Sequence, residues 1–128
     1  MAARMRRYPA VKGGGRVPFT PQNPPAVTDE ALQHILTGRP VAKGRSWSGG
    51  HGHGTGKGKS EFPAGWDAAK IKVAIEQVLM GPDEIERKGS TLYFRGRVFG
   101  QEVEARVRGR NGPPQLWTAY PLPPKNVG

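Results

Sequence analysis

Cysteine is absent from this chain of 128 residues. Its absence excludes disulfide bonds, thiolate nucleophiles and cysteine-based zinc sites. Long apolar runs are absent as well, so we expect no membrane-spanning helix, which needs about 20 consecutive apolar residues. No apolar segment follows the arginines near the N-terminus, and a cleavable signal peptide is therefore not expected. The chemically active groups left to the chain are imidazoles, hydroxyls, carboxylates and amines.

Acidic residues are also scarce, because 10 Asp and Glu stand against 20 Lys and Arg and leave a formal net charge of +10 at pH 7. A field of this sign attracts polyanions and speeds their encounter with the protein, although it says nothing about catalysis. The length is sufficient for one compact domain with a single core and too short for two ordinary domains. We therefore expect one soluble domain with a polyanionic partner.

The first half of the chain alternates between glycine-rich or proline-rich segments and one short helical pattern. Residues 1–27 mix Arg and Lys with Gly and Pro and show no apolar period, which predicts a flexible basic linker. Thr28 is a suitable N-cap for a short helix that Gly38 and Pro40 end. Residues 41–60 have glycine at nearly every second position in their second half, which predicts a long loop.

The second half of the chain predicts one helix followed by a sheet. Asp67 caps a helix with apolar residues at helical spacing, and Gly81 and Pro82 end it. Four strands follow, with a turn at Gly100-Gln101. The predicted strands are Glu84–Arg87, Thr91–Phe99, Glu102–Arg108 and Gln115–Tyr120. The fold class is therefore α+β, with N-terminal helices before an antiparallel sheet, in a domain of residues 28–124 followed by a tail of residues 125–128.

Two histidines, His34 and His51, are the candidate acid and base of a cleavage reaction. Their ordinary pKa of about 6.5 lets one accept and the other donate a proton near neutral pH. On RNA, one imidazole would remove the 2′-hydroxyl proton and the other would protonate the leaving 5′-oxygen, without a metal. DNA lacks the 2′-hydroxyl and would resist this reaction. A histidine in a short helix is more commonly structural, so His34 alone would not establish the chemistry.

The glycines around His51 leave backbone N–H groups unobstructed, which together with Lys57 and Lys59 suits a phosphate. We expect no core around His51. The glycine and lysine spacing does not match a P-loop, so a nucleoside triphosphate site is not expected. A metal site at His51 and His53, with His34 as third ligand, is disfavoured by the lack of cysteine and nearby carboxylates.

Four motifs occur in one order between His34 and Pro121 and together resemble a known family. They are His34-Ile35-Leu36-x-Gly38, Gly49-Gly50-His51 with Gly54-x-Gly56, Gly58-Lys59-Ser60-Glu61-Phe62-Pro63-x-x-Trp66, and Thr118-Ala119-Tyr120-Pro121. This pattern closely resembles the bacterial EndoU nuclease domain at the C-terminus of polymorphic and contact-dependent growth-inhibition toxins. The resemblance implies a fold related to the barnase, EndoU, colicin and RelE group.

The resemblance also implies roles for individual residues. His34 and His51 would be the acid and base, and Lys59 would stabilise charge on the phosphate, a position that Lys57 could also occupy. Thr118 and Tyr120 would contact substrate or act through their hydroxyls. Residues implied in binding phosphate or RNA are Gly50, Lys57 and Ser60. No metal or other cofactor is implied.

The function implied is that of a metal-independent endoribonuclease toxin, which leaves a 2′,3′-cyclic phosphate and a 5′-hydroxyl. Some members of the family attack transfer RNA. Such a domain is delivered as the C-terminal part of a larger toxin, acts in the cytoplasm of the target bacterium and is neutralised by a cognate immunity protein. The positive charge predicts that this protein is acidic. The alternative is a noncatalytic basic module that binds RNA without cutting it.

The remaining aromatic and basic residues leave some alternatives open. Phe62, Pro63 and Trp66 are expected to anchor the end of the loop against the core. Strand alternation puts Thr118 and Tyr120 on one face and Trp117 on the other, in packing. Arginines in the strands predict a charged sheet face that is either solvated or in contact with the RNA backbone. They are Arg95, Arg97, Arg106, Arg108 and Arg110.

Overall fold

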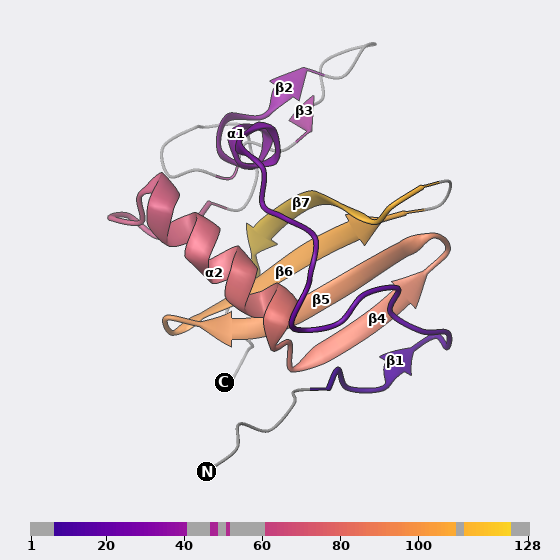
Figure 1. Ribbon diagram of the computed structural model, residues 1–128. Helices are drawn as coiled ribbons and strands as arrows, with labels where there is room; N and C mark the ends of the chain where they lie inside the picture. The colour runs from indigo at the N-terminus through magenta and orange to yellow at the C-terminus, as the bar shows by residue number, and fades with distance from the viewer. Residues whose placement is uncertain (1–6, 41–46, 49–50, 52–60, 110–111, 124–128) are drawn as a thin grey trace.

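The computed structural model describes residues 7–40, 47–48, 51, 61–109 and 112–123. Within these ranges the chain forms two helices, α1 (Asp29–Thr37) and α2 (Ala68–Met80), and a five-stranded sheet. A further antiparallel pair joins β2 (Arg39–Pro40) to β3 (Trp47–Ser48). Helix α2 lies across one face of the large sheet, and α1 stands at the end of the molecule near β7 (Figure 1). The predicted α+β class is confirmed.

The large sheet has the order β1-β4-β5-β6-β7, with strands β1 (Val11–Lys12), β4 (Glu84–Lys88), β5 (Thr91–Val98), β6 (Gln101–Arg108) and β7 (Gln115–Pro121). Strands β4 to β7 pair antiparallel in chain order, as expected. Strand β1 pairs parallel with β4, so the sheet is mixed and not purely antiparallel. The departure arises because β1 comes from the segment expected to be a linker.

Helix α2 forms where its apolar period predicted it. The Asp67 carboxylate accepts a hydrogen bond of 2.8 Å from the backbone N–H of Lys70, which caps the first turn. One face of the helix is buried against β5 and β6, where Phe94 and Val103 have no exposed surface. Fully burying one such side chain contributes about 1.5–3 kcal/mol, so this helix and sheet pair supplies most of the core. The buried residues of the helix are Ile71, Ala74, Ile75, Val78 and Leu79.

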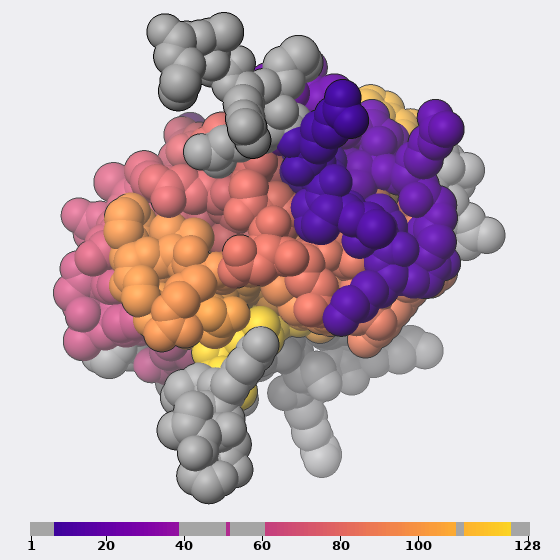
Figure 2. Space-filling view, turned by 90° about the horizontal axis from the view of Figure 1, so that it is seen from below, coloured from indigo at the N-terminus to yellow at the C-terminus, as the bar shows by residue number. Residues whose placement is uncertain are grey.

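The part of the expected linker that the structure describes, residues 7–27, packs against the sheet and the end of α2. The Tyr8 hydroxyl donates a 2.6 Å hydrogen bond to the carbonyl of Leu79, and burial raises the pKa of this hydroxyl. The rings of Tyr8, Phe19 and Phe94 lie within 5.8 Å of one another. Figure 2 shows this segment, indigo to purple, lying against the salmon-coloured part of the chain. The linker prediction is wrong for residues 7–27, because isolated aromatics anchor the segment without a periodic pattern.

The turn between β5 and β6 lies one residue earlier than predicted, because Val98 pairs with Gln101 across the turn residues Phe99 and Gly100. Both turn residues have positive φ, 51° and 77°, as a two-residue type I′ hairpin requires.

No helix in the described part of the chain is long and apolar enough to cross a membrane.

Candidate active site

His51 is held by its backbone between α1 and the segment that precedes α2. Its N–H donates a 2.6 Å hydrogen bond to the carbonyl of Ile35 in α1, and its carbonyl accepts a 2.8 Å hydrogen bond from the N–H of Phe62. The residue is only 7% exposed. The expectation that no core surrounds His51 is therefore wrong. Burial of His51 could not be predicted from the sequence, because the neighbouring glycines have no side chains that would indicate a core.

The ring of His51 lies against the ring of Tyr120 in β7. Their centroids are 5.2 Å apart and the planes are tilted by 36°. Ile35, which accepts the hydrogen bond from His51, follows His34 directly in α1. The fold thus brings two residues of the predicted site, His51 and Tyr120, into contact where α1 meets β7, and α1 also carries His34.

Arg106 in β6 is a site residue that the sequence did not single out for catalysis. Its Nη2 donates a hydrogen bond to the hydroxyl oxygen of Tyr120, and its guanidinium carbon lies 4.9 Å from the centroid of that ring. A guanidinium can only donate, so the Tyr120 oxygen accepts and the phenol keeps its own hydrogen for another acceptor. Only the cross-strand register, which the sequence does not contain, could have identified this residue.

Arg106 belongs to a network that spans four strands on the sheet face opposite α2. Glu104 lies beside Tyr120 across the β6–β7 pair and beside Arg95 across the β5–β6 pair. It accepts hydrogen bonds of 2.6 Å from Arg95 Nε and 3.4 Å from Arg106 Nε. Glu104 is only 4% exposed, so this carboxylate is buried although it lies on the charged face of the sheet. The network holds Arg106, and with it the Tyr120 hydroxyl, in place.

The far end of the network is anchored in β4. Arg95 Nη1 donates hydrogen bonds of 2.6 Å to Glu84 and 2.9 Å to Glu86. Burial by itself lowers the pKa of Arg95, and the hydrogen bonds to Glu104, Glu84 and Glu86 outweigh it, so the net pKa is raised. Hydrogen bonds from Arg95 and Lys12 lower the pKa of Glu84. Arg95, Arg97 and Arg106 are therefore bound to carboxylates of the protein itself, which argues against the prediction that these three contact an RNA backbone.

Thr118 lies in β7 opposite Arg106, on the same face as Tyr120. It is 6% exposed, and its buried Oγ1 has no hydrogen-bond partner in the described part of the chain. A buried hydroxyl without a partner costs about 1–3 kcal/mol. The position is therefore poor for stability alone, which is consistent with the predicted role of this hydroxyl in contacting substrate.

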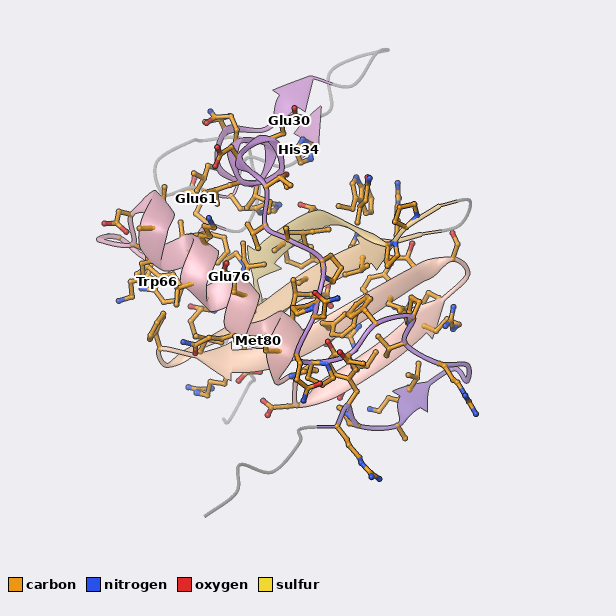
Figure 3. The ribbon with its side chains drawn as sticks, in the orientation of Figure 1. Glu30, His34, Glu61, Trp66, Glu76 and Met80 are labelled. Carbon is orange, nitrogen blue, oxygen red and sulfur yellow. The ribbon has the colours of Figure 1, made fainter. Side chains whose placement is uncertain are left out.

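His34 lines a pocket of about 320 Å³ between α1 and β7. Figure 3 shows Glu30 and His34 projecting from the same side of α1, away from α2. On the strand side Trp117 lines the pocket, and the guanidinium carbon of Arg108 lies 3.2 Å from the centroid of that ring. The polar and aromatic residues of the lining are Thr28, Glu30, His34, Arg108, Gln115 and Trp117.

Trp117 does not point away from Tyr120 as alternation predicted. The β6–β7 register pairs Arg106 with Thr118 but Val107 with Leu116, which leaves Trp117 as the extra residue of a β-bulge. The guanidinium carbons of Arg106 and Arg108 therefore lie 5.8 Å and 3.2 Å from the centroid of the Trp117 ring. A bulge interrupts strand alternation, and this one brings a third aromatic ring to the site.

Several predicted residues lie outside the described ranges: Gly50, His53, Lys57, Lys59, Ser60 and Arg110. Within the described ranges, no three His, Cys, Asp or Glu side chains are grouped as metal ligands.

Phe62 is fully buried and stacks on Trp66 with centroids 5.7 Å apart. The prediction that these residues anchor the end of the loop is confirmed.

Comparison of the chain with protein-family models, with curated proteins and with solved structures gives no match in any of the three. The case for a function therefore rests on the residues of the site and on the motifs in the sequence.

Proposed function

We propose that this chain is a metal-independent endoribonuclease domain of the bacterial EndoU kind, with its active site where α1 meets β7. The observation that carries the proposal is the contact between His51 and Tyr120, whose hydroxyl is held by Arg106. These residues come from distant parts of the chain and meet beside the helix that carries His34. A histidine pair with an oriented phenol is suited to moving protons around a phosphodiester.

The proposed reaction begins when one histidine removes the proton of the RNA 2′-hydroxyl. The 2′-oxygen then attacks the adjacent phosphorus, the bond from phosphorus to the 5′-oxygen breaks, and the other histidine protonates that oxygen. The products are a 2′,3′-cyclic phosphate and a 5′-hydroxyl. Tyr120 and Thr118 donate hydrogen bonds to the substrate, and Lys59 or Lys57 stabilises the extra negative charge on the phosphate.

The distribution of charge along the chain supports a phosphate site beside His51. Four of the 20 Lys and Arg residues, Lys43, Arg45, Lys57 and Lys59, lie within 10 residues of His51 in the sequence. One of the 10 Asp and Glu residues, Glu61, lies in the same range. The sequence around His51 is therefore basic, as a phosphate site requires.

The wider proposal follows the family that the motifs resemble. Its fold would belong with the barnase, EndoU, colicin and RelE group, which the two helices followed by four antiparallel strands support. The domain would be delivered as the C-terminal part of a larger toxin and cleave RNA, transfer RNA in particular, in the cytoplasm of a target bacterium. An acidic immunity protein would bind over the cleft in the producing cell.

The test is cleavage of total RNA, and of a matched DNA, in excess EDTA by the protein and its His34→Ala and His51→Ala variants. We expect RNA to be cut to cyclic-phosphate ends, DNA to be spared, and each variant to be slower by about 10²–10⁴-fold. Arg97→Ala is the matched control, because Arg97 lies on the same sheet and, among the described residues, its side chain pairs with Glu102, away from Tyr120. Its rate should equal that of the parent protein.

Two outcomes would overturn the proposal. RNA that is bound in a salt-sensitive manner but left intact would identify a noncatalytic binding module. Cleavage that EDTA abolishes would identify a metal-dependent enzyme.

A further inference from the structure

The pocket between α1 and β7 has the size of a site for one small group. Its volume of about 320 Å³ is near the lower end of the range for ligand sites in proteins. His34 lines it from α1, and Trp117, the residue before Thr118, lines it from β7. The pocket therefore adjoins the proposed site of cleavage without including Tyr120.

Arg108 differs from the other arginines of the sheet face that the structure describes. Arg95, Arg97 and Arg106 each pair with a carboxylate. Arg108 has no carboxylate partner in the described part of the chain, and its guanidinium carbon lies 3.2 Å from the centroid of the Trp117 ring. A guanidinium stacked on an indole is a planar platform, and unpaired bases of RNA stack on both groups.

The polar groups of the pocket favour a neutral planar ligand over an anion. The carboxylate of Glu30 lines the pocket together with Arg108, and no ion pair joins the two in the described structure. A carboxylate can only accept hydrogen bonds, and it repels a phosphate. Adenine, cytosine and guanine present an exocyclic amino group that can donate to such a carboxylate, whereas uracil has none.

We infer that this pocket is a nucleobase subsite, stacked on Arg108 and Trp117, that prefers a base with an exocyclic amino group. The inference rests on the proposed nuclease function. Trp117 and Thr118 are consecutive, so the base in the pocket belongs to a nucleotide adjoining the one that contacts Thr118 and Tyr120. The preference would thus apply to a neighbour of the cleaved linkage, on one of its two sides.

The experiment uses DNA oligomers that contain a single ribonucleotide, which fixes the point of cleavage. The base on either side is varied among the four, and kcat/KM is measured for each oligomer. At one of the two neighbouring positions, we expect an oligomer with uracil to have a kcat/KM about tenfold lower than oligomers with an amino-bearing base. Glu30→Gln should reduce this ratio toward one, because an amide both donates and accepts.

Trp117→Ala should lower kcat/KM by about tenfold for every neighbouring base, because it removes the stacking platform. Arg97→Ala, outside the pocket, should leave both the rate and the preference unchanged. A second readout needs no turnover. The indole N–H signal of Trp117, assigned by its loss in Trp117→Phe, should shift in NMR spectra on addition of cytidine and much less on addition of uridine.

The outcomes separate this inference from the nuclease proposal. Cleavage at equal rates whatever the neighbouring base, with no response of the indole signal, would overturn the subsite and leave the nuclease. Intact RNA with an indole signal that responds to cytidine would overturn the nuclease and leave a base-binding pocket. A response to inorganic phosphate in place of nucleosides would overturn the subsite by showing an anion site.

Discussion

The two faces of the sheet use the same strands for opposite purposes. In β5, Leu92, Phe94 and Val98 are buried beneath α2, while the intervening Tyr93 and Arg95 lie on the other face among charged partners. The face toward α2 excludes water and carries the core. The opposite face holds ionic hydrogen bonds that end at Tyr120. A single alternating strand thus separates the residues that stabilise the domain from those that position the proposed chemistry.

The comparison also shows why polar groups on the site face are ordered. Glu104 is nearly as buried as the core residues on either side of it, Val103 and Ala105, although it lies on the opposite face. Buried charges persist when they are paired and hydrogen-bonded, and two arginines satisfy this carboxylate. The site face is therefore a second, polar packed layer, and its geometry is constrained much as that of the core is.

The largest effect should come from breaking the core face. Phe94→Ala removes a fully buried ring that contacts Tyr8 and Phe19, and should lower the free energy of unfolding by about 3–5 kcal/mol. Urea denaturation checks this, with Arg97→Ala on the other face expected to cost less than about 1 kcal/mol. Cleavage per folded molecule should be unchanged. Equal losses from the two variants would refute the division between the faces.

An intermediate effect should come from the site face. Arg106→Leu removes the donor to the Tyr120 hydroxyl and should lower kcat of RNA cleavage by about 10- to 100-fold, since hydrogen bonds of charged groups contribute about 1.5–3 kcal/mol. The unfolding midpoint should move less than in Phe94→Ala, because Arg95 still pairs with Glu104.

A double-mutant cycle separates positioning from general destabilisation. If Arg106 acts through Tyr120, Arg106→Leu should have little further effect on kcat in a Tyr120→Phe background. Additive losses in the double variant would show that Arg106 acts elsewhere.

The smallest effect should come from the rim of the site face. Hydrogen bonds from Arg95 and Lys12 lower the pKa of Glu84 below its ordinary 4.5. A lowered folded-state pKa contributes stability above the unfolded pKa, and this contribution is lost as the pH falls through the folded value. Glu84→Gln should therefore lower the free energy of unfolding by less than about 1 kcal/mol at pH 7. At about pH 2 the variant and the parent protein should have the same free energy of unfolding. A difference that persists in acid would contradict the assignment.

The sequence predicted the elements well wherever a periodic pattern and a cap agreed. Thr28 and Asp67 cap the two helices as expected, and the alternation of Val103, Ala105 and Val107 places them in the core. The linker prediction is wrong for residues 7–27. Contacts among three aromatic rings hold that segment against the core, and its aromatic residues do not recur at a helical or strand period that the sequence would reveal. In β7, alternation failed at Trp117 because a bulge depends on the partner strand, which local sequence does not specify.

By itself the sequence determined the helices, the four main strands and the histidines, lysines and hydroxyls that could act on RNA, because local periodicity, capping and side-chain chemistry are properties of short segments. Only the tertiary structure decided that His51 is buried against Tyr120, that Arg106 holds the Tyr120 hydroxyl and that Trp117 joins Arg108 beside His34. These contacts join residues far apart in the chain, and they depend on strand register and helix packing, which emerge only when the whole core is buried at once.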